Sequence, residues 1–222
     1  MSKSLPELTA FLSIKFVLND LKDNKHYAEK LELLIQEEDK RYHEFVYEDN
    51  PSKELLDRYE GRYDLGYSYK KDFPNFQRSS LLIFFDTFLE YRLNNLCELC
   101  AKRLEKKIRV KDIHGNGIPR AINYLEKVIE LDLTSIEKIL EEIFSIHAIR
   151  NCFVHNTGFS EKLDQNTLTY IEKSEHLGIY GFGKVIEVKE TLVPYYIQLL
   201  FNFYNGLIKV VKNFNYKNRK KV

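Results

Sequence analysis

The segment from Phe76 to Lys107 carries apolar side chains on every side, and it constrains the fold more than any other stretch. At about 100° per residue, its apolar positions surround nearly the whole circumference of a helix. These positions are 81–85, 88, 89, 93, 96 and 99. A helix that is apolar all round must be covered by other elements, so we expect it at the centre of a helical bundle.

The composition is typical of long helices joined by few turns. The 222 residues include only nine glycines and five prolines, and 44% of them are hydrophobic. This apolar content is enough for a core and excludes a disordered chain. The net charge of +1 excludes a strongly basic nucleic-acid coat protein, although it does not exclude a local basic patch.

The N-terminal third is predicted to be helical. From Leu5 to about Tyr47 the pattern favours two helices that are divided near Asn19–Asn24. Asn50-Pro51 is typical of an N-cap followed by proline in the first turn, and it predicts a helix that reaches Lys71. Phe73-Pro74-Asn75 is expected to end that helix before the central one begins.

The C-terminal half combines helices with a short hairpin. Pro119 begins a predicted helix that reaches Leu131. Thr134-Ser135-Ile136-Glu137 matches a capping box, so the next helix is predicted to run from there to Asn156, where Thr157-Gly158 ends it. Leu168–Ile171 and Lys184–Val188 are predicted as two strands around a glycine-rich turn, and a last helix covers Glu190–Val211.

The predicted fold class is therefore all-α, an up-and-down helical bundle with a small β-hairpin inserted before the last helix. Neither a repeat nor a low-complexity linker divides the chain, so we expect one domain over residues 1–222. It would comprise an N-terminal helical extension (1–72), a core (76–211) and a basic tail (212–222). Three cysteines and no signal peptide indicate a reduced, cytoplasmic setting, and no apolar run reaches the ~20 residues that span a membrane.

The helix predicted over residues 134–156 places polar groups on its apolar face. On a helical projection Arg150, His147 and Asn151 share the face of Ile143 and Val154, and His155 lies at its edge. A buried arginine is costly unless it is paired or functional. One explanation is a core salt bridge, for instance between Arg150 and Glu90. The other is a functional site.

Residues 150–155, Arg-Asn-Cys-Phe-Val-His, resemble the Arg-x4–6-His motif of the HEPN superfamily (higher eukaryotes and prokaryotes nucleotide-binding domains). In that superfamily a polar residue such as Asn151 commonly follows the arginine. Residues 85–97 also resemble the corresponding helix, in which a glutamate such as Glu90 often sits. The resemblance covers Phe76–Val211. A second spacing match, Arg109 to His114, lacks the polar residue and enters a glycine loop.

The resemblance implies a metal-independent endoribonuclease without a cofactor, with Arg150, Asn151 and His155 as catalytic residues. His147 and Glu90 are candidate accessory groups. Arg150 and His155 point about 140° apart on one helix, so a homodimer with a composite active site is expected. Members of the superfamily are commonly toxins or antiviral effectors, which implies an RNA substrate and an antitoxin or another regulatory partner. The alternative is a catalytically silent HEPN-like module that binds nucleic acid or a protein partner.

Two further features are weaker. A basic stretch is either an RNA-binding surface or an ordinary solvated one, and comprises Lys102, Arg103, Lys106, Lys107 and Arg109. Cys97 and Cys100 have the spacing of a zinc half-site, but both lie in the apolar helix and only Cys152 remains to complete the set. Packing is therefore favoured for these thiols, and no metal site is predicted.

Overall fold

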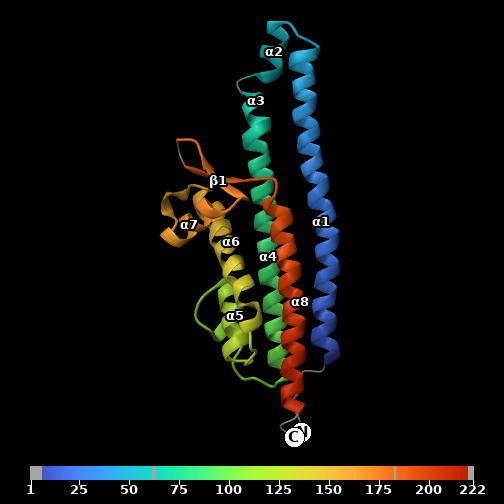
Figure 1. Cartoon of the computed structure of the whole chain (residues 1–222), viewed down its shortest axis with the longest axis vertical. Helices are drawn as coiled ribbons and strands as arrows, with labels where there is room; N and C mark the ends of the chain where they lie inside the picture. The colour runs from blue at the N-terminus through green and yellow to red at the C-terminus, as the bar shows by residue number, and fades with distance from the viewer. Residues whose placement is uncertain (1–6, 62–63, 183, 220–222) are drawn as a thin grey trace.

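Three long helices form the frame of the molecule. The structure is a computed structural model that describes residues 7–61, 64–182 and 184–219. Helices α1 (Glu7–His43), α4 (Phe73–Arg103) and α8 (Leu192–Arg219) lie side by side along the long axis (Figure 1). The shorter α5 (Gly117–Lys127) and α6 (Glu137–Asn156) pack against α4. The predicted all-α bundle is confirmed.

Short elements connect this frame. The far end of the hairpin formed by α1 and α4 is built from a π-helical turn (Glu44–Glu48), α2 (Lys53–Glu60), α3 (Leu65–Tyr67) and a second π-helical turn (Ser68–Asp72). Turns of 3-10 helix lie at Val110–Asp112, Thr134–Ile136 and Ser160–Lys162. After α7 (Gln165–Lys173), strands β1 (Leu177–Tyr180) and β2 (Val185–Val188) pair antiparallel, with Leu177 opposite Val188. This hairpin precedes α8, as predicted.

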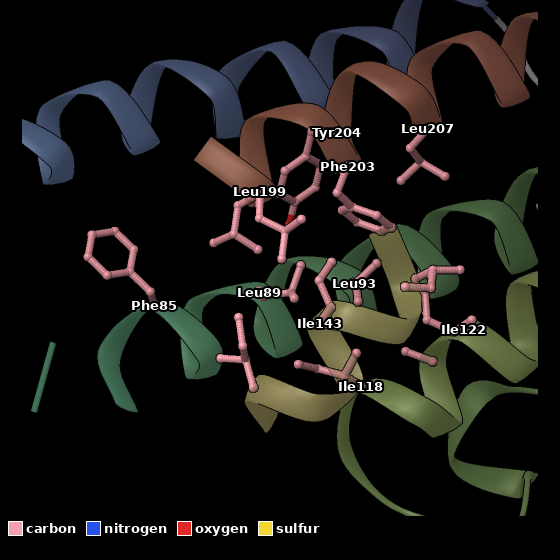
Figure 2. Close-up of a cluster of buried hydrophobic side chains, with 14 of the residues drawn as sticks. Phe85, Leu89, Leu93, Ile118, Ile122, Ile143, Leu199, Phe203, Tyr204 and Leu207 are labelled. Carbon is pink, nitrogen blue, oxygen red and sulfur yellow. The ribbon is translucent and has the colours of Figure 1, made fainter. Parts of the chain in front are cut away.

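The core forms around α4, as its all-round apolar pattern predicts. Phe85, Leu89 and Leu93 of α4 are completely buried. Figure 2 shows Leu89 and Leu93 among side chains of α5, α6 and α8, which include Ile122, Ile143 and Phe203. Helix α1 also contributes to this core, because Ile14, Val17 and Leu21 belong to the same cluster.

The prediction of two N-terminal helices divided near Asn19–Asn24 is wrong. Helix α1 runs without a break from Glu7 to His43. Leu21, inside the expected break, and Ala28, after it, are buried, and Asp20 forms an ion pair with Arg92 of α4. Tertiary packing on α4 and α8 therefore outweighs the weak helix propensity of the intervening polar residues.

The expected helix from Asn50-Pro51 to Lys71 is also different. Ser52 is the N-cap, because its side chain accepts a hydrogen bond of 3.3 Å from the Leu55 amide, and α2 ends already at Glu60 before Gly61. Pro74 does not break the chain and lies in the first turn of α4. The preceding turn is π-helical, so its backbone hydrogen bonds join residues five apart. The bond between residues four apart that a proline removes is therefore already absent from this turn.

Three local predictions in the C-terminal half need correction. Residues 168–171 belong to α7 instead of a strand, because Asp164 caps that helix by accepting from the Thr167 amide at 3.0 Å. Thr134 does not form the predicted capping box; its hydroxyl donates to Asp132, and α6 begins at Glu137. Helix α5 begins at Gly117, and α8 extends to Arg219, so it includes most of the predicted basic tail; residues 220–222 of that tail lie outside the described residues.

Candidate functional site

The buried face of α6 rotates along the helix, and this places the motif residues at its edge. Its buried residues are spaced three positions apart and are Leu140, Ile143, Ile146, Ile149 and Cys152. Each three-residue step turns the buried stripe about 60° backwards. Val154 is therefore 44% exposed, contrary to the expectation that it faces the core. Arg150 and His147 lie on the border, with side chains 16% and 13% exposed.

Asp86 of α4 is the centre of the polar cluster. Its side chain is completely buried. One carboxylate oxygen, Oδ2, accepts a hydrogen bond of 2.8 Å from His147 Nδ1, and the other, Oδ1, accepts one of 3.0 Å from the Tyr196 hydroxyl. Arg150 Nε lies 3.4 Å from Oδ2. Asp86 thus joins α4, α6 and α8, and its negative charge is compensated by Arg150.

The guanidinium of Arg150 is held on two further sides. One NH2 group donates to Asn151 Oδ1 at 2.9 Å, and the other donates to Thr87 Oγ1 at 2.9 Å. Arg150 thus has an acidic partner in the core, as one of the two explanations supposed, but this partner is Asp86, one turn earlier on α4 than the Glu90 given as an example. Sequence reasoning missed Asp86, although an acid inside the apolar run 81–89 was a signal for a buried charge pair.

Glu90 lies beside His147 instead. Both side chains border the backbone of Gly117 at the start of α5. A Cβ atom at Gly117 would lie 3.3 Å from His147 Nε2 and 3.6 Å from Glu90 Oε2. Gly117 also has a φ of +62°, a conformation that favours glycine. The far nitrogen of His147 thus faces α5, away from Asp86.

His155 stands apart from this cluster. It is exposed on the last turn of α6, which ends at Asn156 as predicted, with Thr157 as its C-cap in the left-handed conformation. Along the helix axis it lies about 7.5 Å from Arg150, and the two point about 140° apart. One chain therefore brings Arg150, Asn151 and His147 together, but it does not bring His155 to them.

The basic stretch does not border the site. Arg103 follows Asp86 by 17 positions on α4, which corresponds to about 25 Å along the axis. Lys106 pairs with Glu130 at 3.6 Å, and Arg109 pairs with Glu98 at 3.8 Å. Lys102, Arg103 and Lys107 are exposed at this end of the bundle. An RNA that reached both places would have to extend along the side of the molecule.

Burial keeps several groups protonated. Burial, and then the negative charge of Asp86, raise the pKa of Tyr196 well above its usual value, so its hydroxyl stays a donor to that carboxylate. Burial also raises the pKa values of Cys97 and Cys100, the latter to about 12. A buried neutral thiol is a poor metal ligand. Among the residues that the structure describes, no three acidic, histidine or cysteine side chains form a group able to hold a metal ion.

Comparisons with protein-family models, with curated proteins and with solved structures find no match for this chain. Within the described ranges, no helix is long and apolar enough to cross a membrane.

Proposed function

We propose that this chain is a metal-independent endoribonuclease whose site is built on the C-terminal half of α6. The observation that carries the proposal is the arrangement of Arg150. Its guanidinium is oriented by Asp86, Asn151 and Thr87 at the border of the core, on the same helix as the exposed His155. A cation that is fixed but not fully covered can bind an anionic substrate without much reorganisation.

The chemistry suits these residue types. RNA carries its own nucleophile, the 2′-hydroxyl, so cleavage needs proton transfer and charge stabilisation but no nucleophile from the protein. Arg150 would contact the phosphate oxygens as negative charge develops in the transition state. His155 would transfer a proton, since the reference pKa of histidine is about 6.5. The products would be a 2′,3′-cyclic phosphate and a 5′-hydroxyl.

A second copy of the chain is part of the proposal. Phe84 and Tyr91 of α4 are 47% and 61% exposed, and they flank Thr87, the residue that contacts Arg150. Val154 of α6 is also exposed. A twofold dimer over this face would cover these apolar groups and bring a second motif helix opposite the first, which would compensate for the separation of Arg150 and His155.

The cellular role is proposed from the HEPN resemblance. The enzyme would act in the cytoplasm as a toxin or an antiviral effector, held inactive by an antitoxin or by another regulatory partner. The exposed basic residues at the end of α4 would contribute to RNA binding at a distance from the site.

The test is cleavage of RNA by the purified protein in EDTA. The variants are Arg150→Lys, which keeps the charge but loses the fork, and His155→Gln, each checked for folding by circular dichroism. Arg109→Lys and His114→Gln are matched controls, because these residues form the second Arg-x4-His spacing outside the site. Cleavage that persists in EDTA and in the controls but falls at least 100-fold in both site variants supports the proposal.

A catalytically silent module is the alternative, and the contact between Asp86 and Arg150 favours it by giving the arginine a structural role. Folded wild-type dimers that bind several RNA pools without cleaving any of them would establish this alternative. The stability of Arg150→Met measures how much the arginine contributes to the fold. Unchanged or higher stability would show that the fold does not need the arginine, whereas a collapsed fold would show that it does.

A further inference from the structure

We propose that His147 is the general base of this site and that Asp86 is its positioning residue. The inference rests on the proposed ribonuclease function and extends it, because that function leaves open which group removes the proton from the 2′-hydroxyl. The inference assigns the removal of this proton to His147, a second histidine on α6, and leaves His155 as the proton donor.

The contact with Asp86 defines the state of the His147 ring. Since an ionised carboxylate only accepts hydrogen bonds, Nδ1 carries the proton in the 2.8 Å bond to Asp86 Oδ2. In the neutral ring the lone pair is then on Nε2, which is the atom that accepts a proton in general base catalysis. Asp86 cannot move toward solvent, because it is completely buried and also accepts from Tyr196.

The residue of α5 that faces Nε2 is a glycine, so no side chain from that position covers this nitrogen. A Cβ atom at Gly117 would lie 3.3 Å from Nε2, closer than an ordinary contact. The His147 side chain remains 13% exposed, so it borders solvent. The charged groups around it are Asp86 and Glu90 on α4 and Arg150 on α6. The positive charge that His147 acquires as a base is thus compensated by two carboxylates.

The order of groups along α6 places the proposed base beside the arginine. His147 precedes Arg150 by one turn, about 4.5 Å along the axis, and precedes His155 by about 12 Å. In RNA cleavage the base and the acid act on opposite sides of the phosphorus, so they must flank the phosphate. Arg150, one turn from His147, is placed to contact the phosphate itself. Because His155 of the same chain points away from this cluster, the acid is His155 of the second copy in the proposed dimer.

The step balances within these groups. His147 Nε2 takes the proton from the 2′-hydroxyl while O2′ forms a bond to phosphorus. The bond between phosphorus and O5′ breaks, and protonated His155 donates its proton to O5′. His147 ends protonated and His155 ends neutral, and exchange with water restores both. No metal ion or other co-reactant is required.

The test is the pH dependence of RNA cleavage in EDTA for the wild type, His147→Gln, His155→Gln and the control His114→Gln. Glutamine preserves a donor to Asp86, so the fold is expected to persist. We expect His147→Gln to lower the rate 100- to 10,000-fold and to abolish the loss of rate on the acidic side, which reports the base. His155→Gln should abolish the loss on the alkaline side, and His114→Gln should change neither.

Asp86 is tested by Asp86→Asn, with the nitrogen-15 NMR signals of His147 as a second readout. In the wild type these signals should report a proton fixed on Nδ1, and the variant should populate the other tautomer and lose rate in parallel. A purely structural role of Asp86 would leave the tautomer unchanged. If Asp86→Asn fails to fold, the wild-type tautomer and the His147→Gln profile still decide the matter.

The outcomes separate the two proposals. Suppose that His147→Gln cleaves at the wild-type rate and still loses rate on both the acidic and the alkaline side of its pH profile, while Arg150→Lys is inactive. The assignment of His147 is then overturned and the ribonuclease function stands. A wild-type ring protonated on Nε2 in the neutral state would overturn it as well. If the folded wild type cleaves no RNA at any pH, both proposals fail together.

Discussion

The hydroxyl of Tyr196 donates a hydrogen bond of 3.0 Å to Asp86 Oδ1, and both side chains are completely buried. Tyr196 lies on α8 and Asp86 on α4, so this bond connects two of the three long helices. It also gives the buried Asp86 carboxylate a hydrogen-bond donor in addition to His147 and the nearby charge of Arg150. A buried charge that loses a donor is destabilising.

Tyr196→Phe should therefore lower the free energy of unfolding by about 1–3 kcal/mol. Tyr204→Phe is the matched control, because this tyrosine is also buried on α8 but its hydroxyl finds no hydrogen-bond partner among the described residues. Its replacement should be neutral or stabilising. Urea unfolding of the two variants measures the difference. Equal losses in both would contradict the role given to the Asp86 contact.

Stability should fall in alkaline solution. Burial raises the pKa of Tyr196 and of Tyr204 above the usual value, and raises that of Tyr170 to about 12. Above pH 10 the unfolded chain loses these phenolic protons while the folded chain retains them, so the unfolded state becomes favoured. Each retained proton should cost about 1.4 kcal/mol per pH unit. Unfolding curves between pH 9 and 11.5 test this, and a slope that is the same in Tyr196→Phe would refute it.

Gly206→Ala should destabilise the junction between α8 and the turn before α6. A Cβ atom at Gly206 would lie 2.3 Å from Cγ2 of the buried Ile136, so one of the two elements must shift. We expect a loss of about 1–3 kcal/mol in the free energy of unfolding. Ile136→Ala removes the obstructing atom, so the double variant should lose less than the sum of the single losses. Strictly additive losses in urea unfolding would contradict this contact.

The three thiols should be unreactive in the folded protein. Cys97, Cys100 and Cys152 are buried, and burial raises the pKa of each, so the reactive thiolate is scarce. A thiol reagent at pH 8 should label none of them within minutes, and it should label all three in urea. Rapid labelling of the folded chain would show that α4 or the end of α6 opens locally.

Much of the fold was predictable because its signals are local. The all-round apolar pattern of residues 81–99 placed α4 at the centre. The turn at Thr157-Gly158 ended α6 at the observed residue. The hairpin was expected before the last helix, although its first strand was assigned to residues that form α7. The side chain of Asp164 caps this segment as a helix. In a short element the stabilisation from such a cap is enough to favour a helix over a strand.

What the sequence determined by itself is the fold class and the helix that carries Arg150, Asn151 and His155, because periodicity and turn residues act within one segment. Only the tertiary structure decided that α1 is unbroken, that Asp86 and not Glu90 pairs with Arg150, and that His147 joins the same carboxylate. These outcomes depend on where α4, α6 and α8 cross and on how the buried stripe of α6 rotates. The physical reason is that a buried charge takes the nearest compensating group in space, which spacing along one chain does not define.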